Sequence, residues 1–248
     1  SGGSHKTYFN YIDEIIIDIF NKPINEQPIG IADMGCGDGT FIIHINELLK
    51  NTLRSKHIKN HPIIYICADF NNEALKVTKQ NLVKNNIAHI IINADISNPK
   101  KYNDEIFNKY NLNLNNFLNV RSFLDHNRIY TKPINTFVKE SDSTCTFSSK
   151  GEWISNTALE NNLIEHFNNW RPFITKHGLI VLELHSISPS LCSNLIGKSL
   201  STAYDATHGY SDQYIIELDN FIKCVKLANL DFDFSKSFKF PNNDSATI

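Results

Sequence analysis

The sequence is poor in paired cysteines. Its five cysteines are scattered and never form a Cys-x-x-Cys pair, so the chain lacks the spacing of a zinc knuckle or a disulfide framework. An odd number of unpaired thiols is typical of a reducing compartment, and we expect a cytoplasmic protein. The cysteines are Cys36, Cys67, Cys145, Cys192 and Cys224.

An excess of one charge and a long apolar run are also missing. Lys and Arg number 24 and Asp and Glu number 26, which argues against a surface that binds nucleic acid. No apolar stretch approaches the roughly 20 residues that span a bilayer. The N-terminus has no basic region followed by an apolar core. We therefore expect neither nucleic acid nor a membrane as a partner.

The sequence does contain a regular alternation of short apolar runs and amphipathic helical segments. This pattern is typical of a parallel sheet with helices on both faces. The predicted strands span 29–33, 62–69, 89–95, 117–123, 178–185, 231–240 and 246–248. The predicted helices span 8–20, 40–49, 72–85, 160–174 and 213–227.

The alternation predicts a Rossmann-like α/β fold with a mostly parallel, seven-stranded sheet. With 248 residues, the chain has the length of one large α/β domain, and we expect a single domain over residues 1–248. Residues 1–4, Ser-Gly-Gly-Ser, have the composition of a tag remnant or a linker and carry no information about the fold.

The most informative segment is a glycine-rich turn between the first predicted strand and its helix. It reads Ile31-Ala32-Asp33-Met34-Gly35-Cys36-Gly37-Asp38-Gly39-Thr40, with glycine at three alternate positions. Glycine adopts otherwise forbidden backbone dihedrals and lets a ligand approach the main chain. A simple strand-to-helix turn needs only one glycine, so the segment favours a bound nucleotide-type cofactor.

The spacing of these glycines separates two classes of cofactor. Gly35-x-Gly37-x-Gly39 is not the Gly-x-Gly-x-x-Gly spacing of dinucleotide-binding dehydrogenases. With the acidic residue at the end of the preceding strand, it resembles the glycine motif of class I methyltransferases. The resemblance extends from residue 29 to residue 95. It implies the fold of that family, and S-adenosylmethionine as the cofactor.

The same resemblance implies a set of cofactor-binding residues near the ends of the strands. Asp69 stands where the family places a carboxylate on both ribose hydroxyls; its alternative role is to cap the next helix, which Asn71 or Asn72 can also do. Asp95 matches the acid that reads the adenine amino group, although an Asp before a turn is common. The implied set is Asp33, Gly35, Cys36, Gly37, Asp69, Phe70, Asp95, Ile96 and Ser122.

The segments after the fourth and fifth strands indicate a narrower group. The chain reads Val120-Arg121-Ser122-Phe123-Leu124-Asp125-His126-Asn127-Arg128, where base and glutamine N-methyltransferases carry an Asn/Asp-Pro-Pro-aromatic signature. With Leu182-Glu183-Leu184-His185 and Gly209-Tyr210-Ser211-Asp212-Gln213-Tyr214, it resembles the metal-dependent methyltransferase domains that begin the apratoxin and saxitoxin assembly lines. This resemblance covers nearly the whole chain, from His5 to Ile248.

The narrower resemblance implies one divalent metal, iron or manganese, as a second cofactor. Two imidazoles with an oxygen ligand and open positions suit such an ion, and we expect His126, His185 and Gln213 as ligands. Asp125 is expected as a further ligand or as a residue that orients an imidazole. His208 is the reserve candidate. The other histidines are expected at the surface or at helix ends: His44, His57, His61, His89, His166 and His177.

The reaction implied by the resemblance is methylation at the α-carbon of a malonyl-type thioester, on an acyl carrier protein or another small thioester, in polyketide-like biosynthesis. His126, His185 and Arg121 are expected as catalytic residues, and the metal would stabilise the enolate. Arg121 or Arg128 pairs with the substrate carboxylate or a carrier-protein phosphate, or else forms a surface salt bridge. We expect no helical lid domain.

Two alternatives to this reaction remain open on the sequence. One is a metal-independent O- or N-methyltransferase that acts on small molecules. The other is a module that binds S-adenosylmethionine without catalysis.

Overall fold

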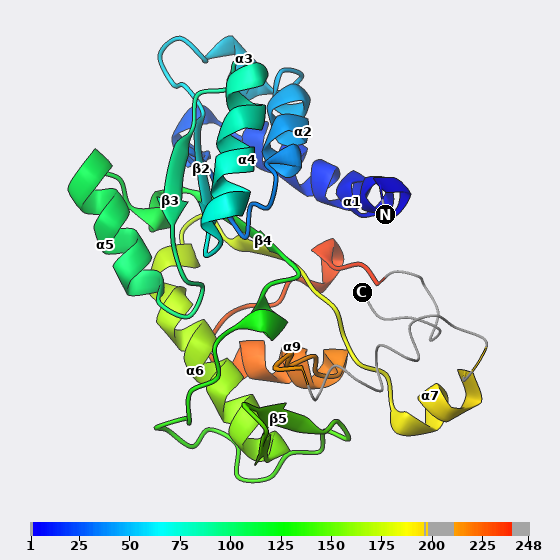
Figure 1. Ribbon diagram of the computed structural model, residues 1–248. Helices are drawn as coiled ribbons and strands as arrows, with labels where there is room; N and C mark the ends of the chain where they lie inside the picture. Colours follow the sequence, from blue (N-terminus) through cyan, green and yellow to red (C-terminus); the bar gives the residue numbers. More distant parts are fainter. Residues whose placement is uncertain (1, 196, 198–210, 240–248) are drawn as a thin grey trace. The chain divides into compact units, whose positions relative to one another are not determined.

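The chain forms two compact units. The computed structural model describes residues 2–195, 197 and 211–239 (Figure 1). The first unit consists of Ser1–Ser122 with Pro172–Val181, and the second of Phe123–Arg171 with Leu182–Ile248. The single domain expected for residues 1–248 stays a prediction.

The first unit contains a five-stranded sheet in the order β3-β2-β1-β4-β7. The pairs β3–β2, β2–β1 and β1–β4 are parallel, which confirms the expected Rossmann-like α/β architecture. Within the described residues this sheet has five strands, so the expected seven are not confirmed. The strands are β1 (Gly30–Met34), β2 (Ile64–Asp69), β3 (Ile90–Asn93), β4 (Leu118–Ser122) and β7 (Leu179–Leu182).

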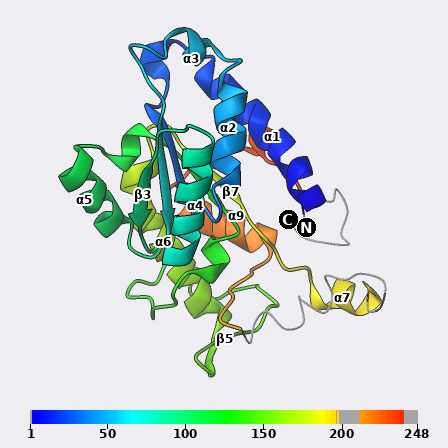
Figure 2. The same ribbon diagram turned by 45° about the horizontal axis from the view of Figure 1, so that its top comes forward.

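Helices connect these parallel strands. Helix α4 packs on β2 and β3, with α2 beside it and α1 beside α2 (Figures 1 and 2). The amphipathic spacing explains this order, because α2 buries Phe41, Ile42, Ile45 and Leu49 on one face. The helices and 3-10 turns of this unit are α1 (Gly2–Phe20), η1 (Ile24–Glu26), α2 (Thr40–Leu49), α3 (Leu53–Lys56), α4 (Asn72–Lys84), α5 (Pro99–Tyr110) and η2 (Leu114–Asn116).

The second unit is built on the long helix α6 and a β-hairpin. The hairpin turns at Lys150 and Gly151, whose φ angles of 53° and 83° are those of a type I′ turn. Buried aromatic side chains of α6, Phe167 and Trp170, form the centre of its core. The elements are η3 (Asp125–Asn127), β5 (Phe147–Ser149), β6 (Glu152–Ile154), α6 (Asn156–Ile174), α7 (Pro189–Leu195), α9 (Leu218–Leu227) and η5 (Phe234–Lys236).

Two elements of the second unit differ from their predictions. The helix predicted for 213–227 begins only at Leu218, because Tyr214 N donates to the His126 carbonyl and Ser186 N donates to the Ile216 carbonyl. The strand predicted for 231–240 is wrong over its described residues. Asp233 accepts hydrogen bonds from Ser235 N and Oγ and closes a 3-10 turn there. The strand predicted for 246–248 lies outside the described residues.

None of the described helices is both long and apolar enough to cross a bilayer. Even α1 and α6, with 19 residues each, have a polar face. On α1 this face includes Asp13 and Glu14.

Strand β1 ends in a buried carboxyl group. Asp33 is 2% exposed, and its Oδ2 has no hydrogen-bond partner. Burial, together with the nearby Asp69 carboxylate, raises the pKa of Asp33 to about 7. The group is therefore mainly uncharged in acidic solution and becomes a buried anion above neutral pH.

We predict that Asp33→Asn becomes more stable relative to the wild type as the pH rises. The folded-state pKa lies above the unfolded one, so this carboxyl group stabilises the fold at low pH and loses that contribution as the pH rises through about 7. Urea unfolding at pH 5 and pH 8, without ligand, should show a relative gain for the variant of roughly 2–3 kcal/mol. The exposed Asp104→Asn is the control. An Asp33→Asn difference that does not change with pH would contradict the assignment.

Candidate functional site

The glycine-rich turn of the first unit has the backbone that its sequence predicts. Gly35, Gly37 and Gly39 have φ angles of 82°, 56° and 80°, a region that other residues rarely adopt. The Gly35 and Cys36 amides both donate to the Ala68 carbonyl, at 2.7 and 3.1 Å. The turn is therefore anchored to the end of β2.

Helix α4 holds the same turn from one side. Thr78 Oγ1 donates to the Gly37 carbonyl at 2.7 Å, and Asn81 Nδ2 donates to the Asp38 carbonyl at 2.8 Å. A Cβ atom on Gly39 would lie 3.1 Å from the Thr78 side chain. A Cβ atom on Gly37 would meet nothing within 4 Å. The open side of the turn is therefore at Gly37, where a ligand can approach the backbone.

Asp69 lies directly beside this open side. Its Oδ2 accepts from Gly37 N at 3.3 Å, and its Oδ1 accepts from Asn71 N at 2.8 Å. The cap of α4 is Asn71, whose side chain accepts from Glu73 N. The alternative role of Asp69 as the helix cap is therefore wrong. The structure thus brings Asp33, Gly35, Cys36, Gly37 and Asp69 together.

The other predicted cofactor residues follow neighbouring strands. Asp95, after β3, accepts from Ser97 N at 2.8 Å and closes a turn. Ile96 is 4% exposed, whereas Phe70 is 68% exposed. Ser122 ends β4 and is half-buried. Their contact with a cofactor stays a prediction.

The two arginines that were expected to pair with a substrate carboxylate or phosphate, Arg121 and Arg128, are both buried. Arg121, within β4, is fully buried, and Arg128, after η3, is 3% exposed. The alternative of a surface salt bridge is therefore wrong for each. A role of Arg121 in catalysis stays a prediction.

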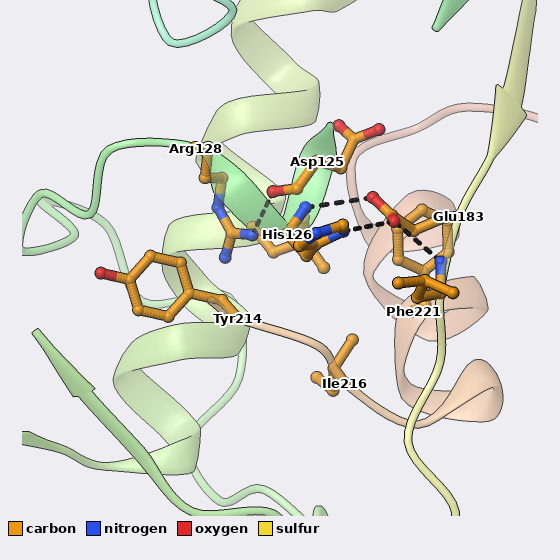
Figure 3. Close-up of a pocket in the computed structure, with 9 residues that line it drawn as sticks. Asp125, His126, Arg128, Glu183, Tyr214, Ile216 and Phe221 are labelled. Carbon is orange, nitrogen blue, oxygen red and sulfur yellow. Dashed lines mark hydrogen bonds and ion pairs between the residues drawn. The ribbon is translucent and has the colours of Figure 1, made fainter. Parts of the chain in front are cut away.

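The second unit contains a small, partly open cavity with a volume of about 10 Å³ (Figure 3). Its polar side chains come from η3, from the residue after it and from the end of β7. The cavity has about the size of one water-sized group. It is lined by Asp125, His126, Arg128, Leu163, Glu183, Leu184, Tyr214, Ile216 and Phe221.

Glu183 fixes His126 within this cavity. The Glu183 carboxylate accepts from the His126 ring Nδ1 at 2.6 Å and from the His126 backbone N at 3.0 Å, as Figure 3 shows. With Nδ1 as the donor, the lone pair of Nε2 remains for an acceptor role, and the amide Nδ2 of Asn127 lies 2.9 Å from it. Sequence reasoning missed Glu183, although it alternates with His185 at the end of the fifth predicted strand.

His185 shows the same pattern with a different acceptor. Its Nδ1 lies 3.2 Å from the Ile216 carbonyl, and its ring packs edge-on against Phe221 at 5.0 Å. Burial lowers the pKa of His185, and the nearby Glu183 carboxylate opposes this effect. A neutral ring with its Nδ1 proton on a carbonyl leaves the lone pair on Nε2.

Asp125 is paired with a histidine that sequence reasoning assigned to the surface or a helix end. Asp125 Oδ1 lies 2.9 Å from His166 Nε2, and the two side chains are 1% and 5% exposed. The expectation for His166 is therefore wrong. His166 lies on the buried face of α6. The helical periodicity of the sequence alone does not show whether a histidine on such a face belongs to a site or only to the core. Asp125 is thus paired with His166, and its predicted role at a metal, as a ligand or behind a ligating imidazole, stays a prediction.

The expected metal ligands are only partly brought together. Gln213 is half-buried and precedes Tyr214, whose backbone N donates to the His126 carbonyl at 2.8 Å, but Gln213 does not line the cavity. His208 lies outside the described residues. Among the residues that the structure describes, no group of three or more His, Cys, Asp or Glu side chains could hold a metal ion. With their Nδ1 protons on fixed acceptors, His126 and His185 would nevertheless have the tautomer of metal-binding histidines, in which Nε2 carries the lone pair.

Several solved methyltransferase structures are similar to this chain. The plantazolicin methyltransferase BamL, in complex with a triazolic desmethylPZN analog and SAH, is 14% identical, with 90% of this chain and 66% of that chain covered and a TM-score of 0.45. The CMeT domain of the citrinin polyketide synthase is 12% identical, with coverages of 83% and 41% and a TM-score of 0.43. An O-methyltransferase family protein from Burkholderia thailandensis is 8% identical, with coverages of 89% and 51% and a TM-score of 0.46.

This chain spans between 41% and 66% of the length of these three structures. No curated protein matches it. The model of the AprA MT2-like domain, however, matches residues 1–248, the whole chain. The methyltransferase fold and cofactor class predicted from the glycine motif are thereby confirmed. The chain belongs to the AprA MT2-like domain family of S-adenosylmethionine-dependent methyltransferases.

Proposed function

We propose that this domain methylates the α-carbon of a malonyl-type thioester carried on an acyl carrier protein, with the help of one divalent metal, iron or manganese. The proposal depends on one observation, namely that His126 and His185 are each held by a hydrogen bond at Nδ1. Each ring has its Nδ1 on a fixed acceptor, the Glu183 carboxylate or the Ile216 carbonyl, which directs Nε2 to a ligand; at His126 a metal would replace the Asn127 amide, 2.9 Å from Nε2. The motif resemblance around these residues supports the choice of acceptor.

In this proposal the first unit binds S-adenosylmethionine. Asp69 accepts from the ribose hydroxyls, and the open side of the turn at Gly37 admits the cofactor to the backbone. The exposed ring of Phe70 is available to the adenine. When bound, S-adenosylmethionine would supply the methyl group to the enolate form of the acceptor, whose α-proton would pass to solvent, and it would become S-adenosylhomocysteine. Positioning of the two reactants supplies much of the rate.

The second unit handles the acceptor. His126 and His185, with Gln213 or Asp125 as an oxygen donor, would hold the metal. When bound, a divalent ion supplies Lewis-acid stabilisation of the negative charge that develops on the acceptor carbonyl. Glu183 keeps the His126 ring in the orientation that this role needs, as carboxylates behind ligating histidines do.

A second candidate is a metal-independent O- or N-methyltransferase that acts on a small molecule. The pair of Glu183 and His126, at 2.6 Å, has the arrangement of a general base oriented by a carboxylate. In that reaction His126 Nε2 would accept a proton from the acceptor hydroxyl or amine. Metal content separates the two candidates, and absence of turnover with any acceptor would leave a binding module.

We predict that Asp69→Ala weakens the binding of S-adenosylmethionine and S-adenosylhomocysteine. Loss of hydrogen bonds to a charged group should reduce the binding free energy by roughly 1.5–3 kcal/mol. Isothermal calorimetry measures this, with the exposed Asp104→Ala as the matched control. Unchanged affinity in a folded Asp69→Ala protein, or tight binding of NAD, would overturn the cofactor site.

We also predict that iron or manganese co-purifies in a near-stoichiometric amount, and that His126→Ala and His185→Ala lose it. Both variants should keep their affinity for S-adenosylhomocysteine, because the glycine turn and Asp69 belong to the first unit. Elemental analysis and calorimetry measure the two properties. The exposed His61→Ala is the control and should keep the metal.

Removal of the metal should also reduce methyl transfer to a malonyl-carrier protein by about a hundredfold or more, since several kcal/mol of Lewis-acid stabilisation are lost. Addition of manganese should restore it. If chelator-treated, metal-free protein transfers methyl groups at the full rate, the metal-independent candidate replaces this one.

A further inference from the structure

Helix α6 contains a buried histidine that the proposed function does not use. The Nε2 atom of His166 lies 2.9 Å from Asp125 Oδ1, and both side chains are buried. A carboxylate oxygen accepts hydrogen bonds, so the imidazole nitrogen is the donor of this bond. A buried carboxylate needs such donors in place of water. The pair therefore fixes Asp125, the first residue of η3, to α6.

A second residue of α6 holds the other end of the same turn. Arg128, directly after η3, donates from Nε to Asn162 Oδ1 at 2.7 Å. It also donates from Nη1 to the Asp125 carbonyl at 2.9 Å, a bond that Figure 3 shows. Asn162 and His166 are four residues apart, so their side chains lie on the same face of the helix. Helix α6 thus holds this turn of three residues on both sides of His126.

The His126 residue lies in the middle of the turn and depends on its position. Its backbone N donates to Glu183 at 3.0 Å, and its ring Nδ1 lies 2.6 Å from the same carboxylate (Figure 3). Its carbonyl accepts from Tyr214 N at 2.8 Å. Glu183 can meet the backbone and the ring together only while the turn stays in place. The orientation of the ring therefore depends on η3, and the position of η3 depends on α6.

We propose that His166 is a positioning residue, which keeps the His126 ring in the orientation of its bond to Glu183 by holding Asp125. Asp125 and His126 are adjacent in the chain, so a shift of the first residue moves the second. A misplacement of about 1 Å is enough to cost a large part of the rate when a side chain must meet a reacting group. The effect on catalysis rests on the proposed function, whereas the effect on the ring does not.

Two amide substitutions that differ in reach test this role. In His166→Gln the side-chain nitrogen replaces the imidazole Nε2 and still donates to Asp125, whereas in His166→Asn it replaces Nδ1 and falls short. Proton–nitrogen NMR on the whole, chelator-treated protein measures how fast the His126 Nδ1 proton exchanges with water. His166→Asn should raise this rate by about tenfold or more, and His166→Gln should leave it within about twofold of the wild type.

Two controls separate positioning from a general loss of stability. The Nδ1 proton of His185 is held by the Ile216 carbonyl, in another segment, and its exchange should not change in any variant. Ile164→Val changes a fully buried side chain of α6 on a different face from His166. It should lower the midpoint of urea unfolding and leave the His126 exchange rate unchanged.

Three outcomes would overturn the proposal. The first is an equal exchange rate of the His126 proton in His166→Asn and His166→Gln, which would assign His166 to the core alone. The second is an equal acceleration in Ile164→Val. The third needs no variant and applies also where His166→Asn does not fold: the wild type at neutral pH must carry a proton on His166 Nε2, and an unprotonated Nε2 would contradict the bond to Asp125.

Methyl transfer to a malonyl-carrier protein separates this inference from the proposed function. His166→Asn should lower kcat by about tenfold or more and keep its affinity for S-adenosylhomocysteine, because the glycine turn belongs to the first unit. His166→Gln should restore most of the turnover. Full turnover in His166→Asn would overturn the positioning role. Faster exchange in His166→Asn, with no methyl transfer by the wild type, would overturn the proposed function and leave the hold of His166 on the ring intact.

Discussion

The hydrogen bonds between Glu183 and His126 organise the polar cavity of the second unit. A buried carboxylate is costly unless it is fully hydrogen-bonded, and Glu183 meets this need by accepting from the ring and the backbone of His126. The two bonds together fix the position of η3 and the tautomer of the imidazole. The same short turn supplies Asp125 to His166 and its carbonyl to Arg128. Loss of Glu183 would therefore disturb every polar group of the cavity.

The two units contain different candidate sites. The first carries the glycine turn, which β2 and α4 hold through the Ala68 carbonyl, Thr78 and Asn81. The second carries the imidazoles and Arg128. In the proposed function, the cofactor class follows from a short motif, while the acceptor site depends on side chains from separate segments. Substitutions in one unit should then change the binding of one reactant only.

The parts that the sequence predicts well are those with local causes. Apolar runs and glycines predict β1 to β4 and the turn around Gly37, because burial on both faces and positive φ leave direct traces in the sequence. The sequence wrongly predicts that the helix begins at Gln213. The hydrogen-bond partners of Tyr214 and Ile216, which keep this segment out of the helix, lie far away in the chain. Glu183 and His166 were missed for the same reason. A buried pair of polar residues is a property of the tertiary structure, and neither partner alone differs from a surface residue.

The central claim is that fixed acceptors hold His126 and His185 with the proton on Nδ1 and the lone pair on Nε2. Long-range proton–nitrogen NMR correlation on nitrogen-15-labelled protein observes this state directly, with each ring assigned by the loss of its signals in the alanine variant. At neutral pH the account predicts a protonated Nδ1 and an unprotonated Nε2 in both rings. A proton on Nε2 of either ring would contradict it, because that ring could then neither bind a metal through Nε2 nor accept a proton there.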